Sequence, residues 1–170
     1  MVKKTSDSMK LIVIAYVFVT SILATYYTKY FITNGVAEWY HFVYQPSITP
    51  PDSLYSIIWM IYNIAVGAAF IKIILELDSI EFPKYNYPYL ANLILEFLWS
   101  YSFFWCRQIG WAMFIVIPMV ILTFKTIIIY KDGDPLAAKI SYVPFIITLY
   151  MALVSLAMVS EHGLKVEIYQ

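Results

Sequence analysis

The run LIVIAYVFVTSILATYYTKYFI, residues 11–32, is almost entirely apolar and contains a single charged residue, Lys29. A helix needs about 20 mostly apolar residues to cross the hydrocarbon core of a bilayer. The basic residues before the run are typical of a secretory signal. The run is too long for the apolar region of such a signal, however, and no small-residue cleavage site is evident. We therefore expect a retained first membrane-spanning helix.

The composition of the whole chain also favours a membrane protein over a water-soluble one. Of its 170 residues, 62% are hydrophobic and 13% are charged, and the mean hydropathy is +0.73. A soluble domain has about 45–50% apolar and about 25% charged residues. The formal net charge is zero, so nothing suggests nucleic acid as a partner. The single cysteine, Cys106, excludes a disulfide framework and a cysteine-based zinc site.

Four further apolar runs follow the first, most of them separated by short links. A backbone in hydrocarbon must satisfy its own hydrogen bonds, and runs such as residues 114–117 do not alternate, so we expect helices and not strands. Short links make neighbouring helices antiparallel. The predicted fold class is all-α, one integral membrane bundle of five transmembrane helices over residues 1–170. The predicted helices are about 11–32, 53–77, 87–105, 109–130 and 140–160, with a loop over residues 33–52.

Lysine and arginine residues are distributed unevenly between the two ends of the predicted bundle, with eight against three. Positive residues favour the cytoplasmic side of a membrane. The sequence therefore predicts a cytoplasmic N-terminus, with the long first loop and the C-terminus on the far side. We expect the cell membrane, or the outer mitochondrial membrane as the alternative. The richer side carries Lys3, Lys4, Lys10, Lys72, Lys84, Lys125, Lys131 and Lys139; the other side carries Lys29, Arg107 and Lys165.

The second predicted helix has a face that offers two interpretations. Trp59, Asn63, Gly67 and Phe70 lie three or four residues apart and therefore share one side. An indole, an amide and a glycine on one face suit a slot for a flat ligand. The same residues also suit a helix-packing patch, with Trp59 as an interfacial anchor.

The third predicted helix carries Glu96 near its middle, on one face with Asn92, Trp99 and Phe103. A charged carboxylate is costly at that depth, so we expect it to face the interior, to be neutral or to be paired. No basic residue lies at a matching depth. Glu96 is either part of a functional site or a neutral side chain hydrogen-bonded to a neighbouring helix, and the residues leave both open.

Residues that would indicate a metal site or a common enzyme class are missing. His41 and His162 have no cysteine or carboxylate cluster at ligand spacing, so we expect no metal site. The chain lacks the motifs of hydrolases, kinases and nucleotide-binding loops. We therefore expect no required cofactor.

Three tracts, in the same order and spacing, resemble the TspO/MBR family, which includes tryptophan-rich sensory proteins, the translocator protein and the peripheral benzodiazepine receptor. The first resembles the family signature WY…KPS…PP…VW…G. The second, LEFLWSYSFFWCRQIGWA at 95–112, resembles a family segment that ends in RQ.GWA. The third resembles the family's entry to its fifth helix. The residues of the first and third tracts are Trp39-Tyr40, Gln45-Pro46-Ser47, Pro50-Pro51, Trp59 and Gly67, then residues 134–139 with Pro144-Phe145.

The resemblance implies a five-helix bundle, often dimeric, with a ligand pocket among the helices that the first loop closes. Family members bind porphyrins and haem-like tetrapyrroles, and some bind sterols or drugs. The implied function is a membrane receptor, sensor or carrier whose partners are membrane lipid, a tetrapyrrole or sterol-like molecule and a second copy of the chain. The candidate ligand-binding residues are Trp39, Tyr40, Pro46, Pro51, Trp59, Asn63, Glu96, Trp99, Phe103, Trp111, Thr148 and Ala152.

Several positions depart from the family pattern. Glu96 replaces a family asparagine that helps to bind ligand, and Asn63 stands where the family has tyrosine. Thr148 replaces a tryptophan associated with light-dependent porphyrin breakdown, so we expect binding and not catalysis. The tail VEIYQ, 166–170, lacks the base that a sterol motif needs. The alternatives are a porphyrin-degrading membrane enzyme and a structural membrane protein with a decayed pocket.

Overall fold

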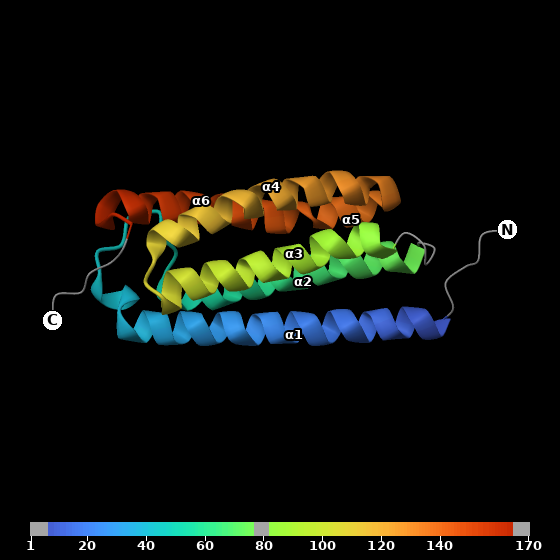
Figure 1. Ribbon diagram of the computed structural model, residues 1–170, viewed down its shortest axis with the longest axis horizontal. Helices are drawn as coiled ribbons and strands as arrows, with labels where there is room; N and C mark the ends of the chain where they lie inside the picture. Colours follow the sequence, from blue (N-terminus) through green and yellow to red (C-terminus); the bar gives the residue numbers. More distant parts are fainter. Residues whose placement is uncertain (1–6, 77–81, 165–170) are drawn as a thin grey trace.

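The computed structural model describes residues 7–76 and 82–164, and those residues form helices without any strand (Figure 1). The predicted all-α fold class is therefore confirmed. The residues outside this description include Lys3, Lys4, Lys165, the tail 166–170 and residues 77–81, which comprise the end of the second predicted helix and the start of the link that follows it. The elements are α1 (Asp7–Glu38), the 3-10 turn η1 (Tyr40–Phe42), α2 (Asp52–Glu76), α3 (Phe82–Ser100), the π-helical turn η3 (Tyr101–Trp105), α4 (Ile109–Gly133), α5 (Pro135–Ile140) and α6 (Tyr142–His162).

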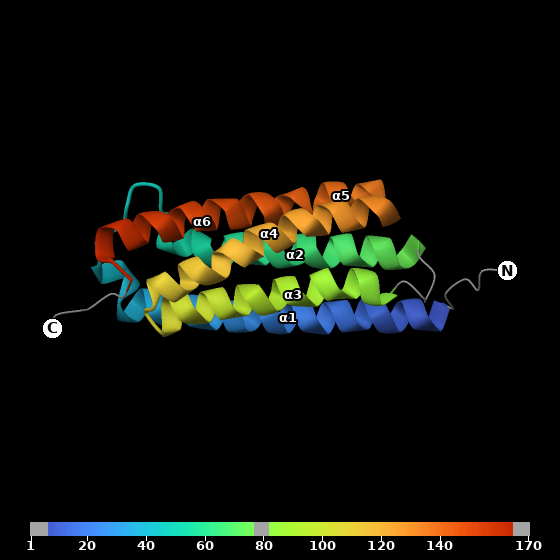
Figure 2. The same cartoon turned by 45° about the horizontal axis from the view of Figure 1, so that its top comes forward.

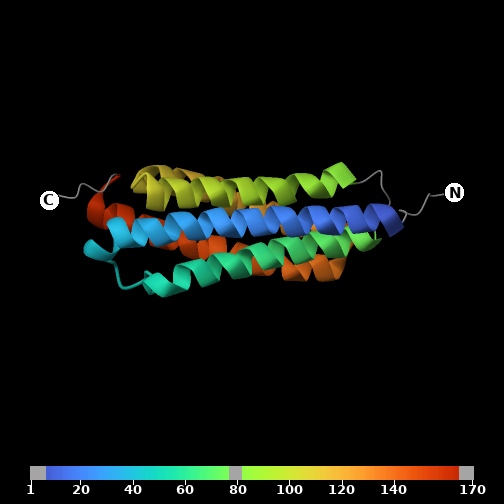
Figure 3. The same cartoon turned by 90° about the horizontal axis from the view of Figure 1, so that it is seen from below.

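The long helices run side by side, and each is antiparallel to the next along the chain. Figure 1 shows α2 and α3 between α1 on one side and α4 with α6 on the other. Seen from below, α1 runs lengthwise between α2 and α3 and packs against both (Figure 3). The loop between α1 and α2 gathers with the end of α6 at one end of the bundle (Figure 2). That end holds most of the predicted site.

Four helical segments of the described chain are long and apolar enough to cross a membrane. The helix α3 is not among them, because Lys84, Asn86, Asn92 and Glu96 lower its mean hydropathy. The structure therefore supports a helical membrane protein with four clear candidate spans. These are Ser8–Glu38, Asp52–Leu75, Ile109–Gly133 and Pro135–His162.

The first helix is longer than the sequence predicted, which shortens the loop. The prediction ended it at residue 32, whereas α1 continues to Glu38. Its extension packs tightly on η3, since a Cβ added at Gly35 would lie 2.6 Å from both the Cβ and the carbonyl oxygen of Phe104. Contact with another segment keeps residues 33–38 helical, which hydropathy alone does not indicate.

The predicted turn between the fourth and fifth helices lies in the right place but is much shorter than expected. Only Asp134 is extended, with φ −152° and ψ 121°. Its side chain accepts a hydrogen bond of 2.8 Å from the Ala137 N–H, and Pro135 occupies the first turn of α5. An aspartate N-cap followed by proline starts a helix efficiently, so α5 begins directly after Asp134. Because α4 continues to Gly133, most of residues 131–139 are helical. The Ala137 N–H and then Lys72, 3.4 Å away, lower the pKa of Asp134.

Candidate ligand-binding site

A cluster of large aromatic side chains fills the loop end of the bundle. Each of its rings is at most 1% exposed. Trp59 and Trp99 have ring centroids 5.0 Å apart, and Trp99 stacks on Phe103 at 5.0 Å. The rings therefore pack directly against one another. The aromatic cluster consists of Trp39, Tyr40, Tyr55, Trp59, Trp99, Phe103 and Phe104.

The π-helical turn η3 ties this cluster to the start of the loop. The Cys106 N–H donates to the Tyr101 carbonyl, five residues back, so the turn is wider than in an α-helix. The indole of Trp39 donates to the Phe104 carbonyl in this turn at 2.7 Å. Arg107 then adopts a left-handed conformation, with φ 58°, which leads the chain into α4. The segment that resembles the family's RQ.GWA tract therefore forms a turn that anchors a loop tryptophan.

Hydrogen bonds close the loop over the bundle. The Tyr40 and Tyr55 hydroxyls lie 2.6 Å apart, and burial raises the pKa of Tyr40 to about 12, so this hydroxyl stays neutral at physiological pH. His41 and Asp52 join the two ends of the loop at 2.8 Å. From α6, the Tyr150 hydroxyl donates to the Ile48 carbonyl and His162 Nε2 donates to the Tyr44 carbonyl, at 2.8 and 2.6 Å.

Within residues 7–76 and 82–164, three buried polar atoms beside the aromatic cluster have no hydrogen-bond partner: Trp59 Nε1, Asn63 Oδ1 and Glu96 Oε2. We call these three side chains the polar patch. They are adjacent, because Asn63 Nδ2 donates to Glu96 Oε1 at 3.0 Å and Trp59 lies one helical turn before Asn63. The nearby Trp99 indole is satisfied by Ser155 Oγ at 3.2 Å. Buried polar groups almost always have a partner, so these three atoms set the patch apart from the rest of the buried interior.

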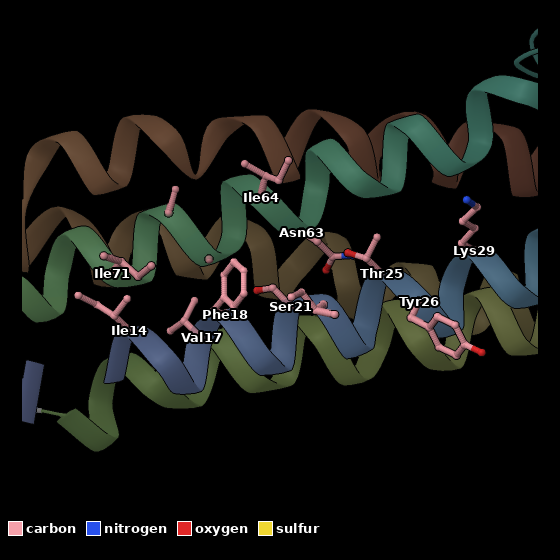
Figure 4. Close-up of a pocket in the computed structure, with 13 residues that line it drawn as sticks. Ile14, Val17, Phe18, Ser21, Thr25, Tyr26, Lys29, Asn63, Ile64 and Ile71 are labelled. Carbon is pink, nitrogen blue, oxygen red and sulfur yellow. The ribbon is translucent and has the colours of Figure 1, made fainter. Parts of the chain in front are cut away.

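A groove of about 560 Å³ runs between α1 and α2, and the polar patch reaches it through Asn63 (Figure 4). Small residues on α2, Gly67 and Ala68, leave room for it. Asn63 is the member of the predicted ligand-binding set that lines this groove. The complete lining is Ile14, Val17, Phe18, Ser21, Ile22, Thr25, Tyr26, Lys29, Asn63, Ile64, Gly67, Ala68 and Ile71.

The structure brings most of the predicted ligand-binding residues together, but not all of them. Trp39, Tyr40, Trp59, Asn63, Glu96, Trp99 and Phe103 form one continuous buried group.

The other predicted residues lie apart from that group or at its margin. Thr148 is buried on α6 and its hydroxyl lies 3.0 Å from that of Thr123. Ala152, also on α6, is half-buried, Pro46 is buried in the loop and Pro51 is exposed. Trp111 is 65% exposed and contacts Phe114, so it faces out of the bundle. The ligand-binding roles of all these residues stay predictions.

Sequence reasoning missed two members of the cluster and the whole α1 wall of the groove. Tyr55 lies four residues before Trp59, so extending the helical face one turn would have found it. Phe104 follows Phe103 directly and enters the cluster because η3 is a π-helix. The α1 residues gave no signal, because that helix is apolar on nearly every side.

A profile of the TspO/MBR family matches residues 12–160, most of the chain. A comparison of the chain with curated proteins found no match. In the described ranges 7–76 and 82–164, no three histidine, cysteine or acidic side chains gather closely enough to hold a metal ion.

Proposed function

Because the chain belongs to the TspO/MBR family, we propose that it is a membrane receptor or carrier for a flat apolar ligand, with a tetrapyrrole as the first candidate. The observation that carries this proposal is the polar patch beside the aromatic cluster. An unpaired buried polar group destabilises a protein by about 1–3 kcal/mol, so a ligand that supplies the missing hydrogen bonds gains affinity there.

The chemistry of the patch suits a ring that is apolar on its faces and polar at a few points. Aromatic side chains offer flat faces against which a macrocycle can stack. The Trp59 indole is a donor, whereas the Asn63 and Glu96 oxygens accept from groups such as pyrrole N–H. Since the rings of the cluster contact one another, binding requires them to separate. The loop is the element that would move, because it carries Trp39 and Tyr40 of the cluster, and hydrogen bonds such as those from His162 to Tyr44 and from Tyr150 to Ile48 hold its outer part.

We further propose that α3 is a fifth span. Its polar side chains Asn92 and Glu96 are at most 1% exposed, whereas apolar residues such as Ile94 and Leu98 are 55% and 40% exposed. A helix with its polar groups facing protein and its apolar side facing outward suits a bilayer. The lysines of the described chain other than Lys29 lie toward the end that holds the α4–α5 junction, which supports a cytoplasmic N-terminus in a cell membrane. We also propose that the chain forms a homodimer, as its resemblance to the family implies.

Titration of purified protein in detergent with protoporphyrin, followed by quenching of tryptophan fluorescence, tests the proposal. We expect saturable quenching in the parent, and weaker affinity by about two- to tenfold in Trp59→Phe, which loses the indole donor. Glu96→Asn, which restores the family residue, should change the affinity. Trp105→Phe is the matched control, because Trp105 is 43% exposed and lies outside the cluster. Absence of saturable quenching in the parent would overturn the tetrapyrrole proposal.

A further inference from the structure

The groove between α1 and α2 is long, and its shape suits an extended chain. On α1 its lining runs from Ile14 to Lys29, about 22 Å, and on α2 from Asn63 to Ile71, about 12 Å, at 1.5 Å per residue. One leaflet of a bilayer core, half of its thickness, is about 15 Å deep. Spread over that length, the volume of about 560 Å³ gives a mean cross-section of only about 25 Å². The space is therefore a narrow slot that is, along α1, at least as long as an acyl chain that spans one leaflet.

The slot opens toward the membrane and is apolar over most of its length. Phe18 on α1 and Ile64 on α2 are 67% and 62% exposed and line it from the two helices (Figure 4). Its floor lies where the helices touch, since a Cβ added at Gly67 would meet Ser21 Oγ at 3.1 Å and a methyl group of Val17 at 3.2 Å. A hydrocarbon chain can enter from the bilayer without crossing the protein interior.

Two polar features give the slot a direction. Lys29 lies at one end, is exposed and has no acidic partner within the described chain. Partway along, Asn63 is 1% exposed and lies beside Thr25 (Figure 4), and its Oδ1 has no hydrogen-bond partner among the residues that the structure describes. A ligand that fits Lys29, Asn63 and the apolar length of the slot carries an anion at one end, a hydrogen-bonding group partway along and an apolar remainder.

We propose that the α1–α2 groove binds a hydroxylated long-chain carboxylate from the surrounding membrane. Its carboxylate lies beside Lys29, its chain follows Gly67 and Ala68, and its hydroxyl meets Asn63. A hydroxyl both donates and accepts, so it can serve the Asn63 amide and the Thr25 hydroxyl together. This ligand is distinct from the tetrapyrrole of the proposed function, which would lie in the aromatic cluster on the other side of Asn63.

Photocrosslinking locates the ligand directly. The purified protein in detergent is labelled with 10-azi-stearic acid, and the labelled peptides are identified by mass spectrometry. We expect labels on residues 14–29 and 63–71. In Ala68→Trp, which fills the slot from an exposed position, labelling there should fall at least about fivefold. Leu23→Trp, at a position of α1 that is 49% exposed and does not line the slot, is the matched control and should label as the parent does. Even labelling of the outward-facing helices, unchanged in Ala68→Trp, would overturn the proposal and indicate ordinary surrounding lipid.

Competition tests the two polar contacts. 7-Hydroxystearic acid should compete with the label about two- to tenfold better than stearic acid, the range of one hydrogen bond. Its hydroxyl lies close enough to its carboxylate for the proposed contacts, because Thr25, beside Asn63, is one helical turn or about 6 Å from Lys29. Lys29→Gln should weaken competition by the hydroxylated acid about two- to fivefold, the range of an exposed ion pair. Competition by the methyl ester of that acid should be the same in Lys29→Gln as in the parent. Lys125→Gln, an exposed lysine on α4, is the control. Equal competition by the acid and its ester would overturn the role of Lys29, and equal competition by the two acids would overturn that of Asn63. Trp59→Phe separates this site from the tetrapyrrole site, because it should leave the labelling unchanged.

Discussion

The aromatic cluster and the α1–α2 groove are built partly on the same helix, α2, yet one is filled and the other is hollow. At the loop end, α2 contributes Tyr55 and Trp59, whose rings pack against rings from the loop, α3 and η3. Two turns further along it contributes Gly67 and Ala68, which leave a slot against α1. The comparison indicates that large side chains on α2 fill the space beside their neighbours, whereas small ones leave a groove open.

Removing a ring from the filled region should have the largest effect. Trp99→Ala should lower the free energy of unfolding by about 3–5 kcal/mol, because it deletes a fully buried indole and leaves a cavity. Denaturant unfolding in detergent, followed by circular dichroism, measures this. Trp111→Ala is the matched control and should change the free energy of unfolding by less than about 1 kcal/mol, since Trp111 is 65% exposed. Equal losses in the two variants would show that the cluster does not stabilise the fold.

Adding a methyl group at each of two glycines contrasts the two regions more finely. Gly35→Ala places a Cβ 2.6 Å from the Phe104 backbone, which cannot move aside without distorting η3. We expect a net loss of about 1–2 kcal/mol, because overpacking outweighs the gain in helix propensity of about 1 kcal/mol. Gly67→Ala meets side-chain atoms at 3.1 and 3.2 Å, and should stay within about 1 kcal/mol of the parent. Thermal unfolding of both variants shows which one loses more stability. A larger loss of stability in Gly67→Ala than in Gly35→Ala would contradict the prediction.

The helix start at Asp134 lies at the opposite end from the cluster and offers a test with a pH signature. Asp134→Ala should lower the free energy of unfolding by about 1 kcal/mol, as for other N-caps. The folded state lowers the pKa of Asp134 below its unfolded value of about 3.9, so its stabilising contribution is complete above that pH. As pH falls through the folded pKa, that contribution is lost and parent and variant should converge.

The matched control for this test is Asp132→Ala. The Asp132 side chain is 68% exposed and lies 4.0 Å from Lys84, a contact that contributes little to stability. Unfolding free energies measured between pH 3 and pH 7 compare the variants. A difference between the parent and Asp134→Ala that persists unchanged at the lowest pH would rule out the carboxylate as the stabilising group.

The smallest expected effect on stability comes from filling the groove. Ala68→Leu should change the free energy of unfolding by no more than about 0.5 kcal/mol, because Ala68 is exposed and borders the open groove. The same variant should nevertheless reduce labelling of the groove by the photoactivatable stearate. A loss of stability as large as that of Trp99→Ala would show that the groove is part of the packed core.

The helices were the most predictable part of the molecule, because each long apolar run lies within one continuous segment. The break at Asp134-Pro135 was also visible, since its N-cap and proline are adjacent in the chain. The extension of α1 to Glu38 was not, because it depends on the contact of Gly35 with Phe104, far away in sequence. The position of Glu96 correctly predicted that its side chain would face the interior. The sequence left open whether Trp59 and Asn63 line a slot or pack against another helix, and their contacts with Trp99 and Glu96 appeared only in the structure.

By itself, the sequence determined that this protein is helical, suited to a membrane and a member of the TspO/MBR family, because hydropathy and motif spacing are properties of continuous segments. Only the tertiary structure decided that the loop-end rings fill their own space, that Trp111 faces outward and that the open volume lies against α1. A cavity is the difference between the shapes of side chains from segments far apart in the chain. No single segment carries that information, so it appears only once the helices are packed.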